Sequence, residues 1–211
     1  MMIDFAALQS ASVVHEPFCY FSAGSVLDTE GLAAVARDFP NINQPGIFPL
    51  SSLHFGGAFA RLVETIRSPR MTSLMAEKFA VRLHDKPLLI TVRGQCQRKD
   101  GRIHCDSKDK IVTCLLYLND ATWDQQGGRL RLLRSQHDIN SVLAEVPPTG
   151  GNFVAFKRAE NSWHGHAPFE GPRRYIMFNW VQSEATLAKN LGRHKLSAFF
   201  KKCFQSSAEQ Y

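Results

Sequence analysis

The sequence predicts a mainly β protein with flanking helices, of the sandwich or jelly-roll kind, and three observations support this. Between residues 88 and 181, about eight short β-prone runs follow one another. Turn-forming residues separate these runs, and no helical periodicity lies between them, which argues against a parallel sheet with crossover helices. The third observation is length, because 211 residues with 44% hydrophobic content can bury one core. We therefore expect a single domain.

The elements before the β region are expected to be helices that support the sheet. Asp28 is a suitable N-cap for a helix that runs to about Asp38, and a long loop follows from 41 to 53. Helical periodicity resumes at 59–66. Ser68 then provides a cap, with proline at the first position of another helix.

We expect the domain to have three parts, with short and closely spaced strands in the middle one. We expect a helical buttress at about 25–85, a β core at about 86–182 and a C-terminal amphipathic helical segment at about 183–206. The strands are expected at 18–21, 88–92, around His104, at 111–118, 128–133, 142–146, 152–156, around Trp163-His164, and at 175–181.

The C-terminal segment concentrates the positive charge of a chain whose formal net charge is +6. Leucine and phenylalanine residues are interleaved with its cations, which are Lys189, Arg193, Lys195, Lys201 and Lys202. This pattern favours a helix with an apolar side packed on the body and a solvated basic face over a binding site for a polyanion.

The cysteines and the N-terminus predict a cytoplasmic protein without a membrane partner. Five cysteines are odd in number and lack CxxC spacing, which argues against a disulfide framework and a structural zinc site. We expect reduced thiols. The N-terminus lacks the pattern of an export signal, and no run approaches the roughly 18 apolar residues of a membrane helix.

His104 and Asp106 form the first candidate for a functional site. On an extended segment, residues two apart point to the same face, so the imidazole and the carboxylate would lie side by side. Mixed nitrogen and oxygen ligands suit Fe(II), Mn(II) or Zn(II). The pair alone also fits an exposed hairpin without function, because a chain with eight histidines produces such spacings by chance.

A second histidine segment about sixty residues downstream supplies a third ligand. His164 and His166 lie there, and Arg173-Arg174 follows on the next expected strand. Two histidines and one carboxylate on a β scaffold form the facial triad of non-haem Fe(II) oxygenases. His164 and His166 would face the same way on a strand, so spacing alone leaves both as candidates.

The order of these residues resembles the 2-oxoglutarate/Fe(II)-dependent dioxygenases, in particular their prolyl-4-hydroxylase-like branch. The resemblance covers about residues 88–181 and implies a double-stranded β-helix core of the jelly-roll, cupin-like type, with iron held by His104, Asp106 and His164. The residues that carry it are His104, Asp106, Tyr117-Leu118-Asn119, Gly127-Gly128, Gly151, His164 and Arg174.

The same resemblance selects the third ligand and an anchor for the co-substrate. Members of the branch have a proline four residues after the iron histidine and an arginine ten after it, and Pro168 and Arg174 match when counted from His164. His166 is then a hydrogen-bonding, substrate-contacting or purely structural residue. Arg174 would bind the distal carboxylate of 2-oxoglutarate as a bidentate fork; otherwise it is a surface charge.

A second contact to 2-oxoglutarate is expected from the strand after the His-x-Asp segment. Thr113 and Tyr117 are both candidates, and the sequence does not decide between them. The co-substrates implied are 2-oxoglutarate and O2, the metal is Fe(II), and ascorbate is a candidate reductant.

The implied activity is a hydroxylase that couples decarboxylation of 2-oxoglutarate, to succinate and CO2, with oxidation of a substrate C–H bond. The substrate would be a small molecule or a protein side chain. Arg98, Lys99 and Arg102 lie near the expected mouth of the barrel and favour a polar, anionic substrate. The sequence does not define the oligomeric state.

Three alternatives to this activity remain. A cupin-like metal-binding isomerase or a sugar-binding module would leave Arg174 without a carboxylate partner. A nucleic-acid dealkylase is disfavoured, because Trp180 stands where those relatives have a second arginine. A degenerate, non-catalytic scaffold is disfavoured because every triad position holds a competent residue type.

Overall fold

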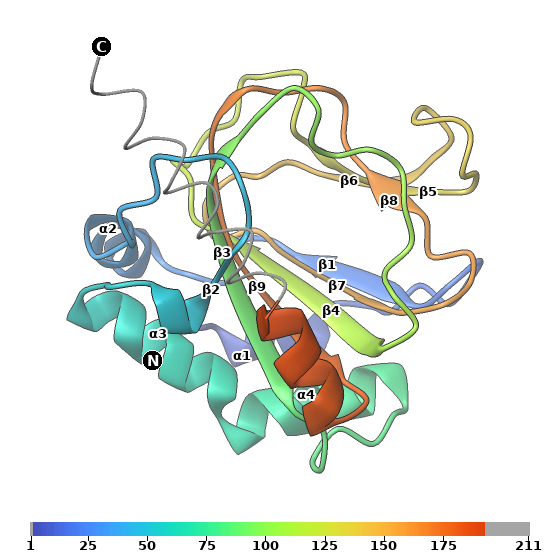
Figure 1. Cartoon of the computed structure of the whole chain (residues 1–211), viewed down its shortest axis with the longest axis horizontal. Helices are drawn as coiled ribbons and strands as arrows, with labels where there is room; N and C mark the ends of the chain where they lie inside the picture. Colours follow the sequence, from blue (N-terminus) through green and yellow to red (C-terminus); the bar gives the residue numbers. More distant parts are fainter. Residues whose placement is uncertain (1, 193–211) are drawn as a thin grey trace.

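The computed structural model describes residues 2–192, and its β part consists of two antiparallel sheets that face each other (Figure 1). The strand order is β1-β7-β4-β9-β3-β2 in the six-stranded sheet and β6-β5-β8 in the three-stranded sheet. This is a double-stranded β-helix, so the predicted fold class is confirmed. The strands are β1 (Tyr20–Ala23), β2 (Phe48–Pro49), β3 (Leu88–Cys96), β4 (Lys110–Tyr117), β5 (Leu130–Leu133), β6 (Val142–Val146), β7 (Phe153–Lys157), β8 (His164–Gly165) and β9 (Gly171–Val181).

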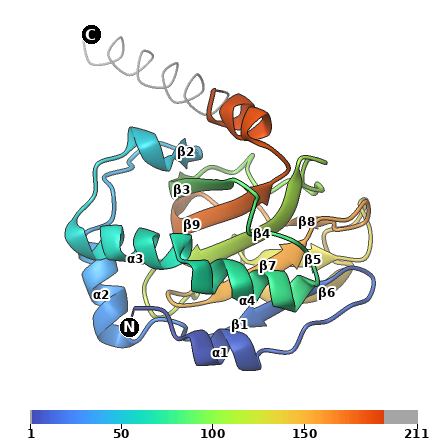
Figure 2. The same cartoon turned by 90° about the horizontal axis from the view of Figure 1, so that it is seen from below.

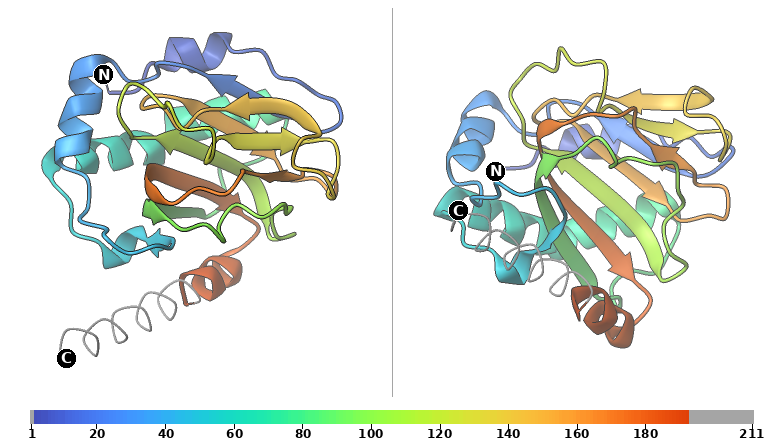
Figure 3. Two further views of the ribbon diagram at one scale, coloured as in Figure 1. Left: turned by 90° about the horizontal axis from the view of Figure 1, so that it is seen from above. Right: turned by 45° about the horizontal axis from the view of Figure 1, so that its top comes forward.

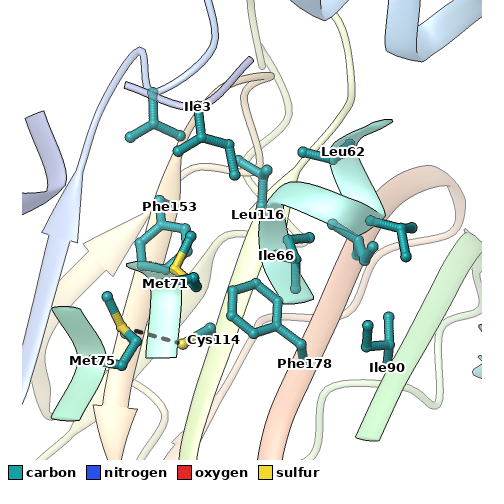
Figure 4. Close-up of a cluster of buried hydrophobic side chains, with 14 of the residues drawn as sticks. Ile3, Leu62, Ile66, Met71, Met75, Ile90, Cys114, Leu116, Phe153 and Phe178 are labelled. Carbon is teal, nitrogen blue, oxygen red and sulfur yellow. Dashed lines mark hydrogen bonds between the residues drawn. The ribbon is translucent and has the colours of Figure 1, made fainter. Parts of the chain in front are cut away.

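Helices cover the face of the large sheet that points away from the small sheet, as Figures 2 and 3 show. Isoleucine and leucine side chains of the helices pack against apolar side chains of β4 and β9, and Figure 4 shows Leu62 and Ile66 close to Leu116 and Phe178. All four of these side chains are fully buried. The helices are α1 (Phe5–Ser10), α2 (Thr29–Arg37), α3 (Gly57–Arg67) and α4 (Pro69–Phe79).

The opposite face of the large sheet meets the small sheet. Because side chains alternate along a strand, Leu115 and Tyr117 of β4 point away from the helices and toward Leu130 and Leu132 of β5. This inner space is only partly filled by apolar side chains. The remainder is the cavity that holds the candidate site.

Two sequence signals for helix starts are confirmed. The side chain of Asp28 accepts a hydrogen bond from the Gly31 amide at 2.6 Å and caps α2. Ser68 caps α4, with Pro69 at the first helical position. Both are local interactions within one turn of the chain, which explains why the sequence reveals them.

Some elements differ from expectation. The segment around His104 is an isolated bridge to His164 rather than a strand. The expected loop at 41–53 contains β2 and a short 3-10 helix, Leu50–Ser52, and β3 extends to Cys96 because its pairing with β9 continues past a bulge. The division into buttress, core and C-terminal segment stays a prediction.

The C-terminal segment is helical at 184–192. The rest of the predicted helix, with the cations at 193, 195, 201 and 202, lies outside the described residues. No helix within residues 2–192 is long and apolar enough to cross a membrane. The four cysteines in that range, Cys19, Cys96, Cys105 and Cys114, are free thiols, and Cys203 lies outside it.

Replacing Asp28 with alanine is expected to lower the free energy of unfolding by about 1 kcal/mol, because the first turn of α2 loses its capping acceptor. Chemical denaturation monitored by circular dichroism measures the change. Glu30→Ala, an exposed position in the same turn, is the control, and an equal loss in both variants would contradict the capping role.

Candidate metal and co-substrate site

His104, Asp106 and His164 come together between the two sheets. Each offers one ligand atom, and these atoms lie within 4.8 Å of one another. His104 and Asp106 belong to the loop between β3 and β4, while His164 begins β8. Two reciprocal backbone hydrogen bonds of 3.0 Å join His104 to His164, so main-chain pairing fixes the two imidazoles side by side.

Both imidazoles are oriented by backbone carbonyls. The Nδ1 atom of His104 lies 2.9 Å from the Arg102 oxygen, and that of His164 lies 2.9 Å from the Ser162 oxygen. A carbonyl oxygen only accepts, so each Nδ1 carries the hydrogen and each Nε2 keeps a free lone pair. Burial lowers the pKa of His164 to about 4, which keeps this ring neutral at pH 7.

Asp106 is held as a carboxylate by two donors. Thr113 Oγ1 donates to its Oδ2 at 2.5 Å, and the Lys110 ammonium donates to its Oδ1 at 2.6 Å. Asn179 in turn donates to Thr113 Oγ1 at 2.7 Å. Burial opposes ionisation of Asp106, but the nearby charges of Lys110 and His164 and these hydrogen bonds outweigh it and hold the pKa of Asp106 at about 2.

The three residues open onto a cavity of about 160 Å³ between the sheets. Its walls combine apolar side chains with a few charged ones. The apolar lining comes from Ile47, Leu115, Leu130, Phe156, Tyr175 and Met177. Besides Asp106, the charged lining residues are Arg93, Lys110 and Arg173.

The predicted orientation of Arg174 is wrong, and its neighbour Arg173 faces the cavity. Arg173 is 3% exposed; its Nε donates to the Gly128 oxygen at 2.7 Å and its Nη2 to the Tyr117 hydroxyl at 3.2 Å. Arg174 lies on the other face of β9, with its guanidinium 5.6 Å from the ring centre of Phe39. The alternation of β9 places Arg174 on the same side as the residues that pack on the helices.

The two candidates for a second co-substrate contact lie at different places. Thr113 lines the cavity and is bonded to Asp106. Tyr117 is fully buried and accepts a hydrogen bond from Arg173. Burial raises the pKa of Tyr117, so its hydroxyl stays protonated and keeps a hydrogen to donate.

His166 also lines the cavity but is not part of the triad. Its Nδ1 donates to the Ala167 oxygen at 2.8 Å, and its Nε2 lies 3.9 Å from the sulfur of Cys96. Burial, followed by the charge of Arg173, lowers the pKa of His166 to about 4. The imidazole of His166 therefore lines the cavity as a neutral group.

Sequence reasoning missed Arg93, Lys110 and Asn179. Each lies on the inner side of the large sheet, where polar residues share a face at every second position, as Thr91 and Arg93 do. That alternation of polar residues inside an apolar strand was the available signal. Within residues 2–192, Thr91 Oγ1, Arg93 Nε and Asn179 Oδ1 are buried without a hydrogen-bond partner. A buried polar atom without a partner is costly, and of these three residues Arg93 lines the cavity.

A double-stranded β-helix with two histidines and one aspartate at its open end defines a class, the non-haem metal-dependent oxygenases. Comparison with known proteins points to a superfamily of such enzymes. Residues 94–182 match the 2OG-Fe(II) oxygenase superfamily. No curated protein matches the chain.

Solved structures support the fold. A prolyl-4-hydroxylase from Pseudomonas putida matches with a TM-score of 0.56 at 17% identity, covering 84% of this chain and 98% of that one. HygX from Streptomyces hygroscopicus, solved with iron bound, gives 0.55 at 13% identity, covering 87% and 88%. A viral collagen prolyl hydroxylase from Paramecium bursaria Chlorella virus-1, solved with 2-oxoglutarate, gives 0.50 at 14% identity, covering 78% and 95%.

Over residues 94–182 the chain is similar to the 2OG-Fe(II) oxygenase superfamily, and its fold is similar to that of prolyl-4-hydroxylases. It is a 2-oxoglutarate-dependent dioxygenase, and its cofactor and co-substrates are Fe(II), 2-oxoglutarate and O2.

Proposed function

We propose that the protein is a hydroxylase of a polar, anionic substrate, with iron held by His104, Asp106 and His164 and 2-oxoglutarate anchored by Arg173. The observation that carries the proposal is the presence of the triad and a buried guanidinium in one cavity. A protein that only binds a metal would need no buried arginine in the same cavity.

The donor set fits Fe(II). Two imidazoles with free Nε2 atoms and one ionised carboxylate give the mixed nitrogen and oxygen ligands that suit this metal. Three protein ligands leave positions open for exogenous ones. When bound, the iron supplies the oxidation of a C–H bond that no amino-acid side chain can perform.

Arg173 and Tyr117 form the anchor for the distal carboxylate. The guanidinium is already oriented by the Gly128 oxygen and the Tyr117 hydroxyl, so little conformational entropy is lost when a carboxylate binds. Tyr117 is fully buried beside the cavity lining, and its hydroxyl contributes by orienting the Arg173 guanidinium. Apolar lining residues such as Leu115 and Met177 exclude water, which strengthens the pairing of Arg173 with a carboxylate.

The cations that favour an anionic substrate in the sequence are also exposed near the cavity in the structure. Arg98, Lys99 and Arg102 occupy the segment after β3 and their side chains are exposed. The neighbouring Gly101 lines the cavity, so this segment borders the site. Exposed cations attract an anion over distance but fix no geometry.

The proposal is tested by an anaerobic titration of the metal-free protein with Fe(II) and 2-oxoglutarate. We expect the weak visible charge-transfer band of the chelate when both are present and no band when either is omitted. Succinate release in air is the second measurement. Metal binding without the band would favour the cupin-like alternative.

Replacing His166 with alanine is expected to change the affinities for metal and 2-oxoglutarate by less than about threefold, because the ring is neutral and lies outside the triad. His164→Ala should abolish the band. The same titration compares the two variants, and loss of the band in both would show that the third ligand is not uniquely His164.

A further inference from the structure

We infer that Arg93 is a binding site for a carboxylate or similar anionic group of the substrate, separate from the anchor for 2-oxoglutarate. The inference rests on the proposed function and names the residue that would impose its anion preference. Three observations support it: the burial of Arg93, the way in which Asp100 contacts it, and the charge of the cavity.

Arg93 is a buried cation that faces the cavity. It is 8% exposed and lines the cavity together with Ile47, which directly precedes β2, and Gly101, which follows β3. Guanidinium groups stay charged at any working pH. Removing such a charge from water is costly unless it is paired and hydrogen-bonded, so its remaining donors favour an anionic partner.

Asp100 accepts a hydrogen bond from only one nitrogen of this guanidinium, Nη1. Its Oδ2 accepts from Arg93 Nη1 at 2.5 Å and also from the Gln97 amide at 3.0 Å. Arg93 Nη1 further contacts the sulfur of Cys96 at 3.6 Å. Within residues 2–192, Arg93 Nε is buried and has no partner. The guanidinium therefore has donors that Asp100 does not occupy, on a residue that lines the cavity.

The charges of the cavity leave room for one more anion. Arg93, Lys110 and Arg173 line it, while Asp106 is its acidic lining residue and Asp100 pairs with Arg93 from outside the lining. The two positive charges of Fe(II) offset the two negative charges of 2-oxoglutarate. Three cations then face two carboxylates, so a substrate with one negative charge would neutralise the site.

The two arginines are close but distinct. Their guanidinium carbons lie 6.0 Å (Arg93) and 5.3 Å (Arg173) from the ring centre of Tyr175. Arg173 is further bonded to Gly128 and Tyr117, whereas Arg93 is bonded to Asp100. One carboxylate can occupy each, and a test must show that Arg93 does not serve 2-oxoglutarate.

The probes for that test are matched acid and amide pairs, butyrate with butyramide and benzoate with benzamide. They are titrated calorimetrically into protein loaded with Zn(II) and saturating 2-oxoglutarate, which excludes turnover. We expect wild type to bind each acid about tenfold more tightly than its amide, since a charge-assisted pair favours the anion. Arg93→Gln should remove the preference, and Arg93→Lys should retain part of it.

Two controls make the result specific. Arg61→Gln removes one exposed cation from α3 and should keep the preference. Affinity for 2-oxoglutarate should change less than about threefold in Arg93→Gln, because Arg173 is intact. If Arg93→Gln does not fold because Asp100 is left unpaired, Arg93→Gln with Asp100→Asn replaces the ion pair by two amides.

The inference is overturned if wild type shows no preference for the acids, or if the preference survives in Arg93→Gln, as it would for an acid bound directly to the metal. It is also overturned if Arg93→Gln loses affinity for 2-oxoglutarate. These outcomes leave standing the proposal of a 2-oxoglutarate-dependent hydroxylase with iron at the triad. Wild type that fails to bind Zn(II) and 2-oxoglutarate would instead overturn the proposed function.

Discussion

Replacing Arg173 with glutamine should weaken binding of 2-oxoglutarate by more than about a hundredfold, because a buried, oriented guanidinium that pairs with a carboxylate contributes several kcal/mol. The amide keeps part of the volume but supplies neither the charge nor the fork. The dissociation constant is measured from the charge-transfer band under anaerobic conditions, with Fe(II) saturating. Affinity for the metal should be nearly unchanged, since Arg173 makes no contact with the triad.

Arg174→Gln is the matched control for this prediction. It removes the same charge from the adjacent residue, whose guanidinium lies over Phe39 on the helix side of β9. We expect less than about a threefold change in affinity for 2-oxoglutarate. If Arg174→Gln gave the large loss and Arg173→Gln the small one, the assignment of the anchor would be reversed, and with it the face of β9 that we assign to the cavity.

The wrong orientation predicted for Arg174 has a physical cause. A period of two separates the faces of a strand, but it identifies the inner face only where one side is exposed to water. Both faces of β9 are buried, one against helices and the other against the small sheet. The composition of the two faces distinguishes them. Ile176 and Phe178 form an apolar face, whereas Tyr175 and Asn179 lie on the same face as Arg173, which lines the cavity.

Local signals were predicted well. The caps at Asp28 and Ser68, the strand runs and the pairing of His104 with Asp106 all depend on residues close in sequence. The resemblance to a family then added His164, which lies far along the chain. The structure brings it to the other two, although the segment around His104 forms a bridge rather than a strand.

Arg93 and Lys110 were not predicted, because the alternation of polar residues within apolar strands does not show which of those residues line a cavity. Arg93 becomes notable only when pairing of β3 with β9 places it opposite Tyr175. Lys110 becomes notable only when the chain reversal after Asp106 brings its ammonium back onto that carboxylate. The first is a tertiary juxtaposition. The second is a contact between residues four apart, but it depends on the path of the loop, which their spacing does not fix.

Lys110 is expected to oppose metal binding. Its ammonium lies 2.6 Å from Asp106 Oδ1, and its side chain is only 14% exposed. A divalent ion at the triad must therefore either accept a like charge nearby or break a buried ion pair. Breaking such a pair costs about 3–5 kcal/mol when one charge is left without compensation. In exchange, the pair keeps Asp106 ionised and ordered before metal arrives.

Replacing Lys110 with methionine should therefore raise affinity for the metal, on the order of a hundredfold. Calorimetric titration with Co(II) measures the change, and unfolding of the metal-free protein should show lower stability, because Asp106 loses its counter-ion. Lys108→Met is the control, since that side chain is 81% exposed and pairs with Glu160 at the surface. Equal or weaker binding of Co(II) by the Lys110 variant would contradict this prediction and would mean that the ammonium assists metal binding, for example by orienting the carboxylate.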